Sequence, residues 1–259
     1  MNRAGSRELP TFNSDGVEIA YERFGEGTPI LLVHGFASNG RVNWVDTGWV
    51  DTLVGAGYAP ILIDNRGHGT SEKPHDPAAY TSKLMAEDAS NLIAHLGVSP
   101  LPVMGYSMGA RISLFLAMQH PEQVSALILG GMGEAVFAPL ADNQEIVEGL
   151  LAPSFQDVSH EKARMFRRFA DSTGSDLRAL AARMRAPHTT LTAQDLLTIE
   201  APALVAVGEE DEIAGSPVPL AAALRNGQAL VIARRDHMRA TGDKKFKSGV
   251  LEFLGHLPR

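Results

Sequence analysis

Short apolar runs alternate with helical patterns along most of this chain, and that alternation is what most restricts its fold. Seven runs have the length and composition of strands, at residues 17–24, 29–33, 59–64, 101–104, 126–129, 203–207 and 229–232. Several of them are apolar at consecutive positions, which is typical of strands covered on both faces. Helical spacing occurs between them, at residues 50–56, 84–96 and 110–120. The sequence therefore predicts an α/β fold, with a parallel sheet between two layers of helices.

The alternation is interrupted between residues 134 and 199, where three or four helical segments follow one another without a strand. We expect an inserted helical lid at 134–199, and a core formed by residues 1–133 and 200–259. Between residues 160 and 188, seven Lys or Arg stand against three Asp or Glu, although the whole chain has a net charge of -7. Such a local excess is typical of a solvated helix face. A cationic lid that attracts anionic substrates is the alternative.

Composition excludes several classes of protein. The chain has no cysteine, so it has no disulfide, no thiolate zinc site and no cysteine nucleophile. Its negative net charge disfavours nucleic acid and anionic membranes as partners. The first twelve residues lack a hydrophobic segment long enough for a signal peptide, and no apolar run approaches about 18 residues. We expect a cytoplasmic protein that acts on a small molecule without a cofactor, and the sequence leaves its oligomeric state open.

A serine stands where one predicted strand meets a predicted helix, in the segment LPVMGYSMG at residues 101–109. A serine hydroxyl is a weak nucleophile unless it is exposed and aimed at a base, and a sharp turn from strand to helix provides both. The turn brings the serine backbone against its neighbours, which favours glycine two residues before and two residues after it. Gly105 and Gly109 occupy those positions. Ser107 is therefore the candidate nucleophile.

A serine nucleophile needs a histidine base, and the base needs an orienting carboxylate. His237 follows the last predicted strand, so its loop lies at the edge of the sheet where Ser107 emerges. No other potential ligand stands at helical spacing beside His237, which argues against a metal site. Asp211 follows the strand at 203–207 and is the favoured acid, but Glu134 follows the strand at 126–129 and remains the alternative. Asp236 is adjacent to the base, and neighbouring side chains usually diverge.

Hydrolysis also requires two backbone N–H groups that face the developing negative charge. The first is expected from Met108, at the start of the helix after the serine. The second is expected from Phe36, in the loop His34-Gly35-Phe36 that follows the strand at 29–33. The Phe36 ring would then also line the acyl pocket.

Taken together, these motifs resemble the α/β-hydrolase family over residues 15–257. The matching segments are residues 34–36, 64–71 (DNRGHGTS), 105–109, 207–211 and 236–238. The resemblance implies an α/β-hydrolase fold with a mostly parallel eight-stranded sheet, a Ser107-Asp211-His237 triad and an oxyanion hole from Phe36 and Met108. It also implies a structural role for residues 64–71. The sequence departs from the family at Asp236, where a small residue is more usual.

Serine at the nucleophile position argues against the dehalogenase and epoxide hydrolase branches, which resemble this chain but have aspartate there. The sequence predicts a serine hydrolase that cleaves a carboxylic ester or related acyl bond through an acyl-enzyme. One alternative is hydrolysis of a carbon–carbon bond in a vinylogous diketone acid. Halide-supported peroxidation through a peracid is another, and a non-catalytic small-molecule receptor on the same fold is a third.

Overall fold

The computed structural model describes residues 9–138 and 143–257. Within these residues one eight-stranded sheet forms, from β1 (Thr11–Ser14), β2 (Val17–Arg23), β3 (Thr28–Val33), β4 (Tyr58–Ile63), β5 (Leu101–Tyr106), β6 (Val124–Gly130), β7 (Ala203–Gly208) and β8 (Gly227–Ile232). The strand order is β1-β2-β4-β3-β5-β6-β7-β8. The pairs β1/β2 and β2/β4 are antiparallel, and all the others are parallel. The predicted mostly parallel sheet of eight strands is confirmed.

The sheet order determines where a site can form. From β3 the chain passes to β4 on one side and then to β5 on the other, so the order reverses between β3 and β5. In open α/β sheets, ligands bind outside the carboxyl ends of strands at such a reversal. The segments that follow β3 and β5 carry the predicted oxyanion loop and Ser107.

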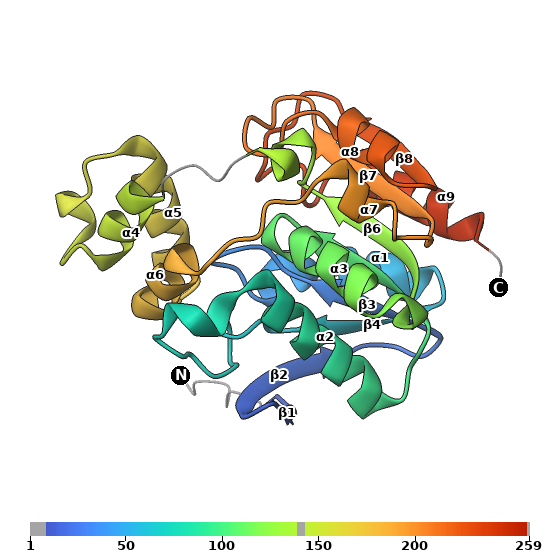
Figure 1. Cartoon of the computed structure of the whole chain (residues 1–259), viewed down its shortest axis with the longest axis horizontal. Helices are drawn as coiled ribbons and strands as arrows, with labels where there is room; N and C mark the ends of the chain where they lie inside the picture. Colours follow the sequence, from blue (N-terminus) through green and yellow to red (C-terminus); the bar gives the residue numbers. More distant parts are fainter. Residues whose placement is uncertain (1–8, 139–142, 258–259) are drawn as a thin grey trace, which may run out of the picture.

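Helices cover both faces of the sheet, as Figure 1 shows. The α-helices of the described residues are α1 (Trp49–Gly55), α2 (Ser82–Leu96), α3 (Met108–Gln119), α4 (Gln144–Leu151), α5 (Glu161–Ser172), α6 (Leu177–Arg185), α7 (Ala193–Leu196), α8 (Pro217–Ala223) and α9 (Lys244–Gly255). Helices α2, α3 and α8 contribute to the hydrophobic cluster on one face, and α1 and α9 contribute to the cluster on the other.

Strand β3 shows why its sequence is apolar at every central position. Leu31 and Val33 lie in the cluster beneath α2 and α3, whereas Ile30 and Leu32 lie in the cluster beneath α1 and α9. All four side chains are fully buried. Since each such side chain contributes about 1.5–3 kcal/mol on burial, the strand is held from both sides.

Strand β1 is the element that the sequence did not predict. It has only four residues, and Phe12 and Ser14 are its buried positions. Its pairing with β2 buries Phe12 against the main core, which gives it a place in the sheet. A run of four residues with one apolar core side chain carries too weak a pattern for sequence-based assignment.

Helices α4, α5 and α6 follow one another between β6 and β7, and Figure 1 shows them grouped to one side of the sheet. They share a hydrophobic cluster of their own, which includes Leu150, Ala170 and Leu180 and extends to Phe36 and Ala37 after β3. Residues 139–142 of the predicted lid lie outside the described residues. Residues 258–259 and residues 1–8 also lie outside them, and the expected absence of a signal peptide concerns the latter range.

One arginine of α5 is buried, although the sequence predicts a solvated face for this segment. Arg167 is buried, its Nη1 group donates to the carbonyl oxygens of Gly149 and Ala152, and its Nε group pairs with Asp171. The carbonyl groups at the end of α4 lack partners within the helix, and Arg167 supplies one. This cation therefore joins α4 to α5. No helix in the described parts of the chain is long and apolar enough to cross a membrane.

Candidate active site

Ser107 occupies a strained turn between β5 and α3. Its φ of 54° and ψ of -114° are unusual for a residue with a side chain. A Cβ atom on Gly105 would lie 2.3 Å from the carbonyl oxygen of Gly109, and one on Gly109 would lie 2.0 Å from that of Val33. Neither position can hold a larger residue without a backbone shift. The Ser107 N–H group donates to the carbonyl oxygen of Gly130 at 2.8 Å, which ties the turn to β6.

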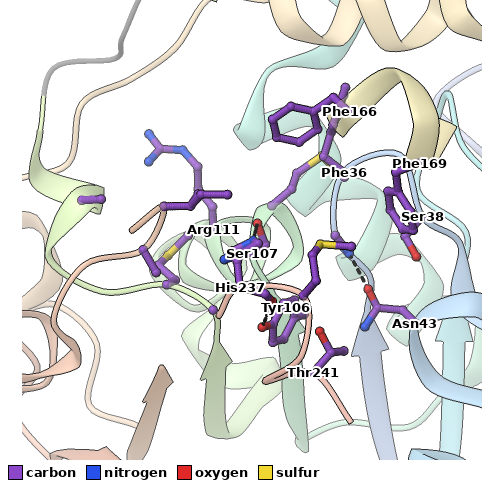
Figure 2. A pocket seen from close by; sticks show the side chains of 18 of the residues that line it. Phe36, Ser38, Asn43, Tyr106, Ser107, Arg111, Phe166, Phe169, His237 and Thr241 are labelled. Carbon is purple, nitrogen blue, oxygen red and sulfur yellow. Dashed lines mark hydrogen bonds between the residues drawn. The ribbon is translucent and has the colours of Figure 1, made fainter. Parts of the chain in front are cut away.

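His237 lies between Ser107 and Asp211, and Figure 2 shows it beside the serine. The distance from His237 Nε2 to Ser107 Oγ is 3.0 Å, and that from His237 Nδ1 to Asp211 Oδ2 is 2.8 Å. Because an ionised carboxylate only accepts hydrogen bonds, Nδ1 carries the proton and donates to Asp211. In the neutral ring, Nε2 is then the acceptor for the serine hydroxyl. This arrangement can remove a proton from Ser107 and return it.

The Asp211 carboxylate is held in place by the loop after β7. Its Oδ1 atom accepts hydrogen bonds from the N–H groups of Ile213 at 3.0 Å and Ala214 at 2.9 Å, and the side chain is buried. Glu134, the alternative acid, is exposed, and its carboxylate accepts from the Ser216 N–H group. The structure therefore brings Asp211, rather than Glu134, to the histidine.

Tyr106 supports the loop that carries the histidine, a role that no sequence motif indicated. Its hydroxyl donates to the carbonyl oxygen of His237 at 2.5 Å, and the two rings lie 5.6 Å apart. Burial raises the pKa of Tyr106 above its ordinary value, so the hydroxyl stays a donor at physiological pH. The residue fills the variable position between Gly105 and Ser107, where the motif itself specifies no residue type.

Hydrogen bonds made by the side chains of Asn43 and His34 hold the loop after β3, and Phe36 of this loop lines the cavity. Asn43 Oδ1 accepts from the Gly35 N–H group at 3.0 Å, and His34 Nε2 accepts from the Asn65 N–H group at 3.0 Å. His34 Nδ1 therefore carries the proton and donates to the Gly35 carbonyl oxygen. Burial lowers the pKa of His34, which keeps the ring neutral. Within the described residues, the buried Asn43 Nδ2 group has no hydrogen-bond partner.

Phe36 and Met108 both line the same cavity as Ser107 and His237. Met108 is the first residue of α3, so its N–H group belongs to the first turn, which has no partner within the helix. The predicted oxyanion donors thus lie on two sides of the serine. Their role in binding an oxyanion stays a prediction.

The cavity above Ser107 has a volume of about 420 Å³ and a largely apolar wall. Helices α5 and α6 contribute Phe166, Phe169 and Met184, and the segments after β6 and β7 contribute Met132 and Ala214. Figure 2 shows Phe166 and Phe169 on the side of the cavity formed by the helical segment. A pocket of this size and polarity suits a small organic molecule.

One part of the cavity wall is cationic. Arg111 of α3, Arg183 of α6 and His188 line it, and neither arginine forms an ion pair with an acidic side chain of the described residues. Desolvation, followed by the charge of Arg111, lowers the pKa of Arg183 to about 10. Desolvation and the same two arginines lower the pKa of His188 to about 4, so its ring is neutral. No sequence motif singles out these three residues, although Arg183 and His188 belong to the segment 160–188 with its excess of positive charge.

A family model described as an alpha/beta hydrolase fold matches residues 28–158, which is about half of the chain. The chain belongs to this family. The matched α/β-hydrolase region includes the loop after β3 and the turn at Ser107. Within the described residues, no group of three or more His, Cys, Asp or Glu side chains is placed to hold a metal ion.

Comparisons with other α/β hydrolases agree with the fold. A putative non-heme bromoperoxidase from Mycobacterium tuberculosis is 32% identical over 165 residues, which are 62% of this chain and 60% of the relative. A 2-hydroxymuconate semialdehyde hydrolase from a Pseudomonas strain is 29% identical over 55% of this chain and 49% of its own length. A solved hydrolase structure from Pseudomonas aeruginosa superimposes with a TM-score of 0.79 at 23% identity, over 98% of this chain and 100% of that chain. This chain thus matches about half to three fifths of the length of these two curated relatives.

Proposed function

We propose that this α/β hydrolase is a serine hydrolase that cleaves a carboxylic ester or related acyl bond of a small molecule. The observation that carries the proposal is the position of His237, within hydrogen-bonding distance of both Ser107 and Asp211. A nucleophile, a base and an orienting acid in this order are what acyl transfer requires. The apolar cavity above Ser107 supplies room for an acyl group.

In the first half of the reaction, Ser107 Oγ attacks the acyl carbon while His237 Nε2 takes the hydroxyl proton. The N–H groups of Met108 and Phe36 stabilise the negative oxygen of the tetrahedral intermediate. When the intermediate collapses, the bond to the leaving group breaks, and His237 gives its proton to the leaving oxygen. The products of this half are an alcohol and an acyl-enzyme on Ser107.

In the second half, water attacks the acyl-enzyme and His237 takes one of its protons. Collapse of the second tetrahedral intermediate returns that proton to Ser107 Oγ and releases the carboxylic acid. Asp211 keeps the histidine ring in the tautomer that both halves need, and it stabilises the imidazolium when it forms. Its two hydrogen bonds from the backbone hold it in that position.

The helical segment 134–199 acts as a lid in this proposal. Phe166, Phe169 and Met184 line the cavity from α5 and α6, and their hydrophobic cluster also includes Phe36 beside the serine. Side chains placed in this way exclude bulk water from the acyl group and restrict its size. Substitutions in this segment are therefore expected to change substrate preference more than the chemistry itself.

A fluorophosphonate probe together with p-nitrophenyl acetate tests the proposal. Wild-type protein is expected to react covalently with the probe and to hydrolyse the ester, and Ser107→Ala is expected to lose both activities. Ser113→Ala is the matched control, because Ser113 lies on α3, the helix that follows Ser107, and donates within it to the Gly109 carbonyl oxygen. Labelling or turnover that persists in Ser107→Ala would remove the basis of the proposal. Absence of labelling in wild type would favour a non-catalytic receptor.

A second candidate reaction is hydrolysis of a carbon–carbon bond in a vinylogous diketone acid. The similarity to a 2-hydroxymuconate semialdehyde hydrolase supports it, as does the cationic part of the cavity wall. Comparison of kcat/KM on a diketone acid and on a short-chain ester separates the two reactions. A higher value on the ester favours the first proposal, and a higher value on the diketone acid favours the second.

The bromoperoxidase relative suggests a further use of the same acyl-enzyme. If hydrogen peroxide replaces water as the attacking molecule, the product is a peracid, which oxidises bromide and returns to the carboxylic acid. Bromination of a dye in acetate, peroxide and bromide measures this reaction. It is expected to disappear in Ser107→Ala together with ester hydrolysis.

A further inference from the structure

We propose that Arg111, Arg183 and His188 form a binding site for a carboxylate group of the substrate. The cavity would then accept acyl compounds that carry a second, anionic group at the end remote from the scissile bond. The substrate class rests on the proposed serine hydrolase function, whereas the anion site itself can be tested without catalysis. We call these three side chains the cationic end of the cavity.

Arg111 places one guanidinium close to the nucleophile. It is the fourth residue after Ser107, and its N–H group donates to the Ser107 carbonyl oxygen at 3.1 Å. Four residues of helix correspond to about 6 Å along the axis of α3. The side chain is 9% exposed, its Nη2 group donates to the Thr189 carbonyl oxygen, and its Nε group has no partner within the described residues. Figure 2 shows Arg111 and Ser107 at the same cavity.

Arg183 brings a second positive charge to the same wall from α6. Its side chain is 5% exposed, and its Nη1 group lies 3.3 Å from His188 Nε2. Since arginine only donates, His188 Nε2 is the acceptor, and the ring proton of the neutral imidazole lies on Nδ1. In the described residues, both Arg183 Nε and His188 Nδ1 are buried without a hydrogen-bond partner. Each of the three side chains of the cationic end therefore has a buried nitrogen donor without a partner in the described residues.

Burial of two guanidinium groups without a carboxylate is unfavourable in an otherwise apolar cavity. A buried charge is normally paired, because desolvation costs several kcal/mol per ion. The unsatisfied atoms of the cationic end are all donors, and the only acceptor among its side chains, His188 Nε2, is already used. An anion with two acceptor oxygens would supply what is missing, and a carboxylate matches the planar guanidinium.

The position of the cationic end also restricts the substrate. The anion would bind beside α3 while the scissile carbonyl lies at Ser107, at the start of the same helix. Both groups have to fit in a cavity of about 420 Å³, together with the chain that joins them. These limits favour the monoester of a short dicarboxylic acid, or an acyl compound of similar length that ends in a carboxylate.

Calorimetric titration with glutarate and adipate tests the site directly. Both dianions are expected to bind wild type and Ser107→Ala alike, and adipamide, the uncharged diamide of adipate, is expected to bind at least tenfold more weakly than adipate. Arg111→Met and Arg183→Met should each weaken adipate binding by roughly tenfold or more, since hydrogen bonds to charged groups are lost. Arg183→Lys keeps the charge without the planar fork, and it is expected to bind adipate with intermediate affinity.

Arg185→Met is the matched control, because Arg185 lies two residues further along α6 and is exposed. It should bind adipate as wild type does, and an equal loss in this variant would overturn the site in favour of general attraction by the helix. Equal binding of adipate and adipamide would also overturn it, and so would inorganic phosphate binding more tightly than both dianions. Circular dichroism of each variant verifies that it is folded.

A kinetic comparison extends the test to the substrate. Hydrolysis of monomethyl adipate should exceed that of methyl hexanoate in kcat/KM by at least tenfold, and Arg183→Met should remove the difference, mainly through KM. If no ester is hydrolysed while adipate still binds, the serine hydrolase proposal fails and the anion site stands. If both esters are hydrolysed equally and adipate does not bind, the anion site fails and the hydrolase proposal stands.

Discussion

The two ends of one cavity differ in how far their polar groups are satisfied. At the triad end, Ser107, His237 and Asp211 are hydrogen-bonded in sequence, and Asp211 receives two further backbone hydrogen bonds. At the cationic end, each of the three side chains keeps a buried donor without a partner among the described residues. The first end is complete before any ligand arrives. The second needs an anion to complete it.

This difference has an energetic counterpart. Groups that act on the transition state work best when they are fixed in advance, because no reorganisation is then needed during the reaction. Groups that recognise a substrate gain affinity when the ligand satisfies donors that are otherwise buried and unpaired. The triad end therefore has the properties of a catalytic site, and the cationic end those of a specificity site. Substitutions at one end should therefore affect catalysis, and substitutions at the other should affect the binding of an anion.

The largest expected effect comes from Asp211→Asn at the triad end. The amide cannot accept the Nδ1 proton of His237 in the same way, so the ring adopts the wrong tautomer, and kcat on an ester should fall by about 10⁴-fold. Adipate affinity should stay within about twofold, because Asp211 does not reach the cationic end. Steady-state kinetics and calorimetry on the same preparation measure the two quantities.

Glu134→Gln is the matched control for that substitution. Glu134 is exposed and accepts from the Ser216 N–H group, so its loss should leave kcat nearly unchanged. A larger loss of kcat in Glu134→Gln than in Asp211→Asn would assign the acid to Glu134. That outcome would require a rearrangement of the loop after β7.

Acid is expected to destabilise the folded protein through His68, whose ring lies 5.2 Å from that of His34 and 5.9 Å from that of Phe36 in the loop after β3. Burial, followed by the charge of His34, lowers the pKa of His68 to about 3, whereas an unfolded histidine titrates near its ordinary value of 6.5. The unfolded chain therefore binds more protons below pH 6.5. His68 should lower the free energy of unfolding by up to about 1.4 kcal/mol per pH unit as the pH falls from about 6.5 towards its folded pKa.

Urea denaturation between pH 7 and 4 measures that slope. In His68→Gln, the free energy of unfolding should depend less steeply on pH, by up to about 1.4 kcal/mol per pH unit, because one proton fewer is taken up on unfolding. This change in slope is expected whatever effect the substitution has on stability at pH 7. His256→Gln, at an exposed position, should leave the slope as in wild type. An unchanged slope in His68→Gln would mean that His68 becomes protonated in the folded protein.

Arg183→Met is expected to stabilise the protein in the absence of ligand. Replacement of a buried ion by an apolar side chain of similar length removes a desolvation cost, and it should raise the free energy of unfolding by about 1 kcal/mol. A loss of about 1 kcal/mol or more would instead make Arg183 a structural residue, held by His188 and by the last turn of α6. At the same concentration, adipate should raise the melting temperature of wild type by more than that of Arg183→Met.

The two ends also differ in how visible they are in the sequence. Ser107, Asp211 and His237 each follow a strand of the parallel sheet, and the carboxyl ends of such strands share one edge. Strand patterns and one glycine motif were therefore enough to place them near each other. The sequence favoured Asp211 as the acid but left Glu134 as the alternative, because both residues follow strands at that edge.

The cationic end could not be predicted in the same way. Arg111 and Arg183 lie on different helices, and the way α6 packs against α4 and against the turn at Pro77–Tyr80 decides whether Arg183 is buried. A charge excess in a helical segment indicates a solvated face as readily as a ligand site. Arg167 shows a third outcome, because it is buried and satisfied by carbonyl oxygens of α4. Only the tertiary contacts separate these cases.

Tyr106→Phe should have the smallest effect, and it tests how rigid the triad end has to be. The substitution removes the hydrogen bond from the Tyr106 hydroxyl to the His237 carbonyl oxygen and keeps the ring that packs against the histidine. Because one neutral hydrogen bond contributes about 1 kcal/mol, kcat should fall by roughly fivefold, while adipate affinity stays as in wild type. Thr241→Val, on the cavity wall near the same hydroxyl, should change kcat by less. A fall in kcat of a hundredfold or more in Tyr106→Phe would show that the position of the His237 loop depends on this single hydrogen bond. The hydrogen bonds among Ser107, His237 and Asp211 would then not be enough to hold the triad end in place.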